Sequence, residues 1–277
     1  MTPPPFSPWR LLAGLLLSLA IGYGGYRRAA LSRSGVLGAV LTGTCTFGLG
    51  GWGWGALLVA FFASSSALTQ YRRKEKAILA ADFAKAGPRD LGQALANGGL
   101  GCFLALGHLL APHPLWTAAF VGAMAAVNAD TWGTEVGILW GRRVWLIPTG
   151  RPVPPGTSGG VSWPGILASL GGAAFLGVLA ALFQGLGAAG SSPTPGILLA
   201  GGLVGGLAGA LADSWLGATV QCVYFCPRCG KETERALHSC GTQAQPVRGF
   251  RWLHNDGVNL AASAVGALAA GLLAALA

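Results

Sequence analysis

Hydrophobic residues occur along this chain in long runs that short polar segments interrupt. Most runs contain about 20 residues, the length that an α-helix needs to cross a hydrocarbon core of roughly 30 Å. The pattern predicts an all-α fold, a polytopic membrane helix bundle of about eight spans that forms one domain over residues 1–277. The expected spans are Trp9–Tyr23, Ser34–Phe47, Trp52–Gln70, Leu91–Leu110, Leu115–Leu139, Trp163–Gly187, Pro195–Val223 and Gly257–Ala277. The second is short, and with the third it could form a re-entrant pair.

The composition agrees with a membrane protein. Only 10% of the 277 residues are charged and 46 are glycines, whereas about 25% of residues are charged in a soluble domain. Small residues let helix backbones approach closely inside a membrane. The first run resembles the core of a signal peptide, but no small-x-small cleavage site precedes Arg27 and Arg28. We therefore expect a retained membrane anchor.

Basic residues are confined, apart from Arg10, to the connections after the first, third, fifth and seventh spans. The other connections, 48–51, 111–114 and 188–194, carry no Lys, Arg, Asp or Glu. With an even number of spans, all basic connections lie on one side, which the positive-inside rule identifies as cytoplasmic. We expect an integral protein of the cell membrane with both termini outside. The net charge of +9 follows mostly from this topology and indicates no nucleic-acid partner.

Two of the expected spans contain a similar segment. Val121–Trp132 and Val204–Trp215 lie 83 residues apart and share Val, Gly, two Ala, Asp and Trp at matching positions. Both run in the same direction across the membrane, which indicates a parallel internal repeat. The alternative is a chance similarity between two helices that are rich in glycine and alanine.

Each copy of the segment carries one of the nine acidic residues of the chain, Asp130 or Asp213. Each acid lies about ten residues before its span ends, roughly 15 Å deep in a regular helix. A carboxylate at that depth costs several kcal/mol unless it meets a partner or a hydrated cavity. With Glu135 nearby, the three acids predict a Mg²⁺ site near the cytoplasmic face. Structural pairs with arginine, or a proton relay in a transporter, are the alternatives.

The connection after the fifth span is rich in glycine and hydroxyl residues. It contains Gly156-Thr157-Ser158-Gly159-Gly160 and ends where the next helix begins, so free N–H groups and the helix dipole point towards it. Such a loop can hold phosphate groups, although an ordinary turn has the same composition. It lacks the lysine of a P-loop. Arg142, Arg143 and Arg151 would have to supply the positive charge.

Cys226, Cys229, His238 and Cys240 form a C-x₂-C-x₈-H-x-C pattern in the basic connection 223–252. Four ligands of these types suit a tetrahedral structural Zn²⁺, which would stabilise a cytoplasmic loop with little core of its own. A redox-active Cys226–Cys229 pair is the rival interpretation.

Further polar residues open the fourth and eighth spans. Asp90, Gln93 and Asn97 share one helix face that is too polar for lipid and must point into the bundle. At the eighth span, Asn255 or Asp256 could cap the helix, and Asn259 shares the face of Asp256. The sequence allows two roles for Asn255 or Asp256, as a helix cap alone or as a cap that also binds a ligand.

These motifs, in this order, resemble the phytyl-phosphate kinase family of integral membrane proteins, long catalogued as a domain of unknown function. The residues that carry the resemblance are Arg89-Asp90 with Gln93 and Ala96-Asn97-Gly98-Gly99, Asn128-Ala-Asp130-Thr-Trp-Gly-Thr-Glu135, Pro155 to Ser162, Asp213-Ser-Trp-Leu-Gly217 with Gln221, and Asn255-Asp256 with Val258-Asn259. The resemblance extends from about Leu31 to the C-terminus. More distantly, the chain looks like CTP-using dolichol and phytol kinases and phosphatidate cytidylyltransferases, but its glycine-rich loop has no lysine.

The resemblance implies transfer of a phosphoryl group from a nucleoside triphosphate, with CTP expected, to a prenyl monophosphate such as phytyl or geranylgeranyl phosphate. It places Mg²⁺ and catalysis at Asp130, Glu135 and Asp213. It implies that the nucleotide and its phosphates are contacted by Asn128, Thr134, Arg142, Arg151, Gly156, Thr157, Ser158, Gly159, Gly160 and Gln221. It implies that the substrate is contacted, or the polar site residues are supported, by Arg89, Asn97, Asn255, Asp256 and Asn259. Zn²⁺ would be structural.

Two other functions fit the same residues. A cytidylyltransferase acting on a lipid phosphate would release pyrophosphate instead of CDP. A small transporter would use Asp130 and Asp213 as relay groups and predicts acids or polar residues that continue into the outer half of the spans. Against this, the acids are all central or cytoplasmic, and the outer connections carry no Asp, Glu, Lys or Arg.

Overall fold

The computed structural model describes residues 7–79, 87–186 and 193–277, with the side chains of 77–79 left out. Its helices are α1 (Pro8–Arg27), α2 (Arg33–Cys45), α3 (Trp52–Gln70), α4 (Arg73–Leu79), α5 (Leu91–Leu110), α6 (Pro114–Trp140), α7 (Trp163–Gly185), α8 (Pro195–Thr219) and α9 (Asn255–Leu276). A π-helical segment, η1 (Thr46–Gly50), continues α2. Gly51, with φ +91°, separates η1 from α3.

The helical membrane architecture predicted from the sequence is confirmed. Each expected span corresponds to a helix, although Gly187, the expected end of the sixth span, and Lys85 lie outside the described residues. Among the described residues, five helices, α3, α5, α7, α8 and α9, are long and apolar enough to cross a membrane. The remaining expected spans correspond to α1, α2 and α6, so a total of eight crossings stays a prediction.

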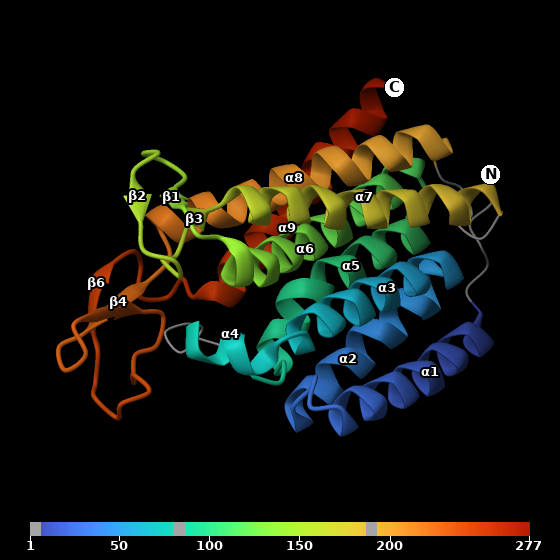
Figure 1. Cartoon of the computed structure of the whole chain (residues 1–277). Coiled ribbons are helices and arrows are strands. Elements are labelled where there is room, and N and C mark those ends of the chain that lie inside the picture. The colour runs from blue at the N-terminus through green and yellow to red at the C-terminus, as the bar shows by residue number, and fades with distance from the viewer. Residues whose placement is uncertain (1–6, 80–86, 187–192) are drawn as a thin grey trace.

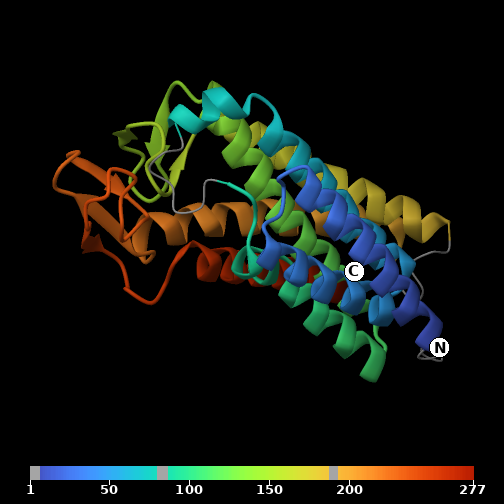
Figure 2. The same ribbon diagram turned by 90° about the horizontal axis from the view of Figure 1, so that it is seen from below.

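One end of the bundle gathers the connections that are rich in basic residues. The turn between α1 and α2, helix α4 and the connections after α6 and α8 lie at this end, whereas α1 begins and α9 ends at the opposite one (Figure 1). Figure 2 shows the same grouping from below. We call it the basic end. The alternation agrees with an even number of long helices.

Two small antiparallel sheets at the basic end correct the all-α prediction. The first contains β1 (Val144–Leu146), β2 (Pro152–Val153) and β3 (Gly160–Val161), in the order β2-β1-β3. The second contains β4 (Val223–Cys226), β5 (Lys231–Thr233) and β6 (Gln245–Arg248), in the order β5-β4-β6. Strands this short, among prolines and glycines, show no alternation that would reveal them in the sequence.

The two sheets occupy equivalent places in the chain. The first connects α6 to α7, the second connects α8 to α9, and in each the first strand is central. The similar segments of α6 and α8 are thus followed by similar elements. This arrangement agrees with the predicted repeat, which stays a proposal about how the chain arose.

Helix α6 lies at the centre of the bundle, in contact with α3, α5, α7, α8 and α9. Glycines bring α6, α8 and α9 together. A methyl group added at Gly205 would lie 2.8 Å from Gly122 Cα and 2.6 Å from Gly266 O. The helix backbones therefore touch directly, as the glycine content predicts.

Candidate functional site

A cavity of about 480 Å³ lies near the basic end, with walls from α3 to α9 and both connecting loops. It is the place where most of the expected site residues meet. The expected residues that line it are Arg89, Asn97, Asp130, Thr134, Glu135, Gly156, Thr157, Ser158, Gly159, Gly160, Asp213, Gln221, Asn255 and Asn259.

Asp130 and Asp213 enter this cavity from α6 and α8, as the repeat predicts. Their carboxylates are close enough to repel each other electrostatically. Asp213 Oδ2 is buried and has no hydrogen-bond partner within the described residues. Helix α8 ends at Thr219, so Asp213 lies about 9 Å from the helix end, less deep than expected. An oxygen without a protein partner is available to an ion or to water.

Glu135 has a different environment from the two aspartates. It forms an ion pair with Lys76 of α4 and accepts a hydrogen bond of 2.5 Å from Thr69 Oγ1. Lys76 also donates to the carbonyl of Leu68 at 2.5 Å. The charge of Glu135 is therefore already compensated by the protein. No pattern in the sequence indicated this pair, because Lys76 lies in a basic run that is typical of headgroup contacts.

The glycine-rich loop contacts the end of α8. Gly159 has φ +80°, and a methyl group there would lie 2.4 to 2.6 Å from atoms of Ala218. Ser158 Oγ donates to Gly217 O at 3.1 Å. The backbone of this loop therefore lies directly against the end of α8. The N–H groups of Thr157 and Gly160 bond within the loop, so only its other amides are available to an anion.

Several expected contacts lie outside the cavity. Asn128 is fully buried, accepts hydrogen bonds from Ser64 and Ser65 at 3.0 and 3.3 Å, and donates to Gly172 O at 2.8 Å. It joins α3, α6 and α7 and is structural. Arg142, Arg143 and Arg151 are exposed around the first sheet and do not line the cavity.

The expected cap of α9 is also wrong. His254 occupies the N-cap position, and Asn255 and Asp256 are the first residues of the helix. Asn255 and Asn259 line the cavity, but Asp256 does not. At α5, Asp90 and Gln93 form a capping box, with Gln93 N 2.9 Å from Asp90 Oδ1. Asp90 is therefore a helix cap, and Gln93 also reaches the cavity.

Arg89 and Gln221 supply hydrogen-bond donors to the cavity wall. Arg89 donates to Ser66 Oγ at 3.2 Å and lies over the rings of Phe61 and Phe62, 5.7 and 5.9 Å from their centroids. Burial lowers the pKa of Arg89, and the negative charge of Glu135 opposes that shift. Gln221 is only 2% exposed, and its Nε2 has no partner within the described residues. The side chains of Arg89 and Gln221 therefore favour a ligand with many hydrogen-bond acceptors.

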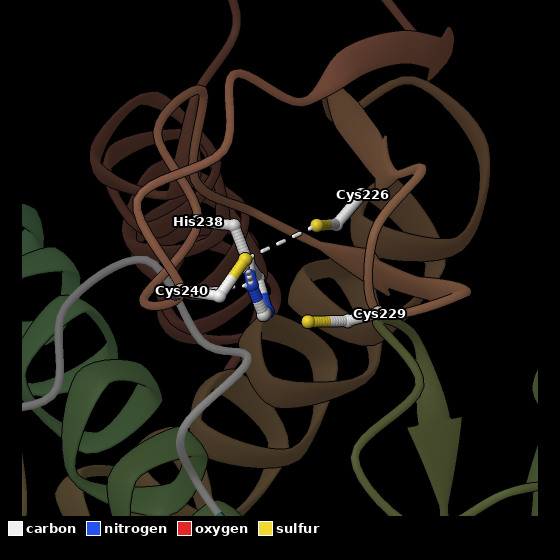
Figure 3. Close-up of side chains that lie close together, drawn as sticks. All are labelled: Cys226, Cys229, His238 and Cys240. Carbon is white, nitrogen blue, oxygen red and sulfur yellow. Dashed lines mark hydrogen bonds between the residues drawn. The ribbon is translucent and has the colours of Figure 1, made fainter.

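The connection after α8 brings four metal-ligand side chains together. Cys226, Cys229, His238 and Cys240 point towards one another (Figure 3), with their ligand atoms all within 4.8 Å. Cys240 Sγ lies 3.1 Å from His238 Nδ1. Hydrogen bonds from Thr242 and His238 lower the pKa of Cys240 to about 5, which favours the thiolate that binds metal. The set suits a metal such as Zn²⁺.

The same connection contributes an acid that the sequence analysis missed. Glu234 follows β5, lines the cavity and repels the carboxylates of Asp130 and Asp213. No spacing rule in the sequence connects a residue between Cys229 and His238 to a distant helix. Together with Glu135, four carboxylates thus line one cavity, from α6, α8 and the metal-binding loop.

Comparison with known proteins identifies the family. Residues 16–267 match the family described as integral membrane protein DUF92. The chain belongs to this family. Membership confirms the resemblance that the motifs indicated. No solved structure matches the chain.

Relatives of this chain are found in Arabidopsis thaliana, Synechocystis sp. and Methanocaldococcus jannaschii. Protein PGR of Arabidopsis thaliana is 30% identical over 277 residues, which cover 93% of each chain. Protein VTE6, chloroplastic, of the same plant is 27% identical, over 88% of this chain and 65% of its own. An uncharacterised membrane protein, MJ0933, of Methanocaldococcus jannaschii is 28% identical, over 76% of this chain and 84% of its own.

Proposed function

We propose that this protein is a membrane kinase that transfers a phosphoryl group from a nucleoside triphosphate, with CTP expected, to a prenyl monophosphate. The observation that carries the proposal is the meeting of Asp130 and Asp213, from two similar helices, in one polar cavity at the basic end. The family resemblance is the basis for the type of reaction, and the cavity is the proposed location of that reaction.

The acids fit a hard divalent cation. Carboxylate oxygens suit Mg²⁺, which keeps several waters and takes its remaining ligands from phosphate. Asp213 Oδ2 lacks a hydrogen-bond partner within the described residues, as expected of an oxygen that coordinates a metal ion. Asp130 and Asp213 would hold the ion, with Glu234 close by, and Mg²⁺ when bound would neutralise the phosphate oxygens of the donor. Glu135, paired with Lys76, would position that lysine instead.

Phosphoryl transfer needs positioning and charge neutralisation more than covalent help from the protein. An oxygen of the prenyl monophosphate attacks the terminal phosphorus of the donor, the bond from that phosphorus to the bridging oxygen breaks, and the nucleoside diphosphate leaves. The attacking oxygen is already anionic, so no strong base is required. Arg73, Lys76 and Arg89, which line the cavity, can balance the charge on the transferred group.

The proposed location is the cell membrane, with the cavity facing the cytoplasm. The clustering of basic connections at the end that contains the cavity supports this orientation. The Cys226, Cys229, His238 and Cys240 group would hold a structural Zn²⁺, and membrane lipid would surround the bundle.

The reaction can be tested with full-length protein in detergent, Mg²⁺, CTP or ATP labelled on the terminal phosphate, and a panel of prenyl monophosphates. We expect label in a prenyl diphosphate, with activity abolished by Asp130→Asn and Asp213→Asn. Glu232→Gln, at an exposed acid outside the cavity, is the matched control and should keep full activity. Release of pyrophosphate with a CDP-lipid product would show a cytidylyltransferase instead, and full activity in both variants would remove the metal-site assignment.

A further inference from the structure

A second, apolar pocket lies beside the polar cavity, among α1, α2, α3 and α5. Its lining is mostly hydrocarbon, and includes Leu31, Leu58, Val59, Phe61 and Phe62. Helix α1 packs on α2 and η1. The pocket lies between α1 and α2 on one side and α3 and α5 on the other. Nothing in the proposed chemistry uses this space.

The two spaces share one wall. Arg89, Gln93 and Asn97, from the start of α5, line both the apolar pocket and the polar cavity. They form a polar junction between a place suited to hydrocarbon and a place suited to phosphate and metal. The guanidinium of Arg89 lies over the rings of Phe61 and Phe62, so one side chain contacts both environments. This cation is fixed where a phosphate and its apolar chain would meet.

The size of the pocket limits what enters it. Its volume is about 70 Å³. The polar cavity beside it is about 480 Å³, so the apolar pocket has room for only the first part of a long chain, which would have to continue between helices towards the lipid.

We propose that this pocket binds the phosphate-proximal carbons of an apolar chain whose phosphate monoester lies against Arg89, Gln93 and Asn97. The inference rests on the proposed function for the identity of the acceptor, and adds where its chain binds. Burial of hydrocarbon gives the pocket its affinity, and Arg89 gives the preference for a phosphate over the free alcohol. The chain enters from the lipid, and the phosphate faces the acids across the cavity.

Binding measurements on the full-length protein in detergent test this proposal without requiring turnover. The probe is radiolabelled geranylgeranyl monophosphate, with the free alcohol and inorganic phosphate as unlabelled competitors. Val59→Phe and Ala39→Leu fill the pocket from α3 and α2. We expect each to weaken binding of the monophosphate at least tenfold. Arg89→Gln should remove the preference for monophosphate over alcohol.

Matched controls add similar bulk on the same helices outside the pocket. Ala63→Leu and Leu41→Phe are at exposed positions of α3 and α2, and should change the affinity less than twofold. A midpoint of thermal unfolding equal to that of the wild type shows that the filled variants are folded. Wild-type affinity for the monophosphate in both filled variants would overturn the inference. A third outcome separates the two proposals. If the wild type transfers no phosphoryl group but binds the monophosphate, and the filled variants lose that binding, the kinase proposal is refuted and the pocket assignment stands.

Discussion

Lys76 and Glu135 form an ion pair whose side chains are only 6% and 16% exposed. Lys76→Met would leave Glu135 charged and without its partner beside the cavity. Removing one member of a buried pair costs about 3–5 kcal/mol, because the remaining charge keeps its desolvation cost. For a chain of this size, each kcal/mol lowers the midpoint of thermal unfolding by about 2–4 °C. We therefore expect a decrease of about 6–20 °C in Lys76→Met.

Two further variants separate the ion pair from simple loss of a lysine. In the double variant Lys76→Met with Glu135→Gln, neither position carries a charge and Thr69 can still donate to residue 135, so stability should return to within about 1 kcal/mol of the wild type. Phosphoryl transfer should stay low, because the lysine is still missing.

Arg72→Met breaks the pair with Glu75 nearby, whose side chains are 43% and 55% exposed. An exposed pair of this kind contributes at most about 1 kcal/mol. Midpoints of thermal unfolding in one detergent provide the assay. A Lys76→Met variant as stable as Arg72→Met would refute the reasoning, as would a double variant no more stable than the single one.

Four more predictions concern separate parts of the structure. Gly159→Ala should weaken nucleotide binding at least tenfold, since its methyl group would overlap Ala218, whereas Gly150→Ala, at a similar φ of +64° with open space around it, should keep wild-type affinity in the same titration. Asn128→Ala should lower the free energy of unfolding by about 2–4 kcal/mol, through the loss of three buried hydrogen bonds, and a thermal midpoint equal to that of wild type would argue against its structural role. Glu234→Gln should raise the Mg²⁺ concentration needed for half-maximal activity several-fold, and an unchanged Mg²⁺ titration would remove Glu234 from the site. Elemental analysis of protein purified without chelator should find one zinc per chain, lost in Cys229→Ser, and zinc-free wild-type protein would end that assignment.

The helices and the acid pair were accessible from the sequence for clear physical reasons. A run of about twenty apolar residues in a membrane forms a helix, so the presence and approximate position of the long helices follow from hydropathy. Asp130 and Asp213 stood out because a carboxylate inside such a run needs a reason to be there. Their matched places in similar segments then indicated that they would meet, and both line the same cavity.

The features that the sequence analysis missed depend on contacts between distant parts of the chain. Lys76 contacts Glu135 from a short helix outside the main bundle, and Glu234 reaches the cavity from a loop whose pattern indicated only a metal site. Arginines 142 and 151 were expected in the site because they are near the glycine-rich loop in sequence. Both instead flank strands of the first sheet, are exposed and do not line the cavity. Register and turn direction decide such questions, and neither is encoded in local composition.

The most direct test of the acid site is a titration of Mn²⁺ in place of Mg²⁺ into the full-length protein with CTP, followed by electron paramagnetic resonance of the free ion. If Asp130 and Asp213 hold the divalent cation together, Asp130→Asn and Asp213→Asn should each weaken Mn²⁺ binding at least tenfold, and Glu232→Gln should leave it unchanged. Wild-type Mn²⁺ affinity in both aspartate variants would contradict the account.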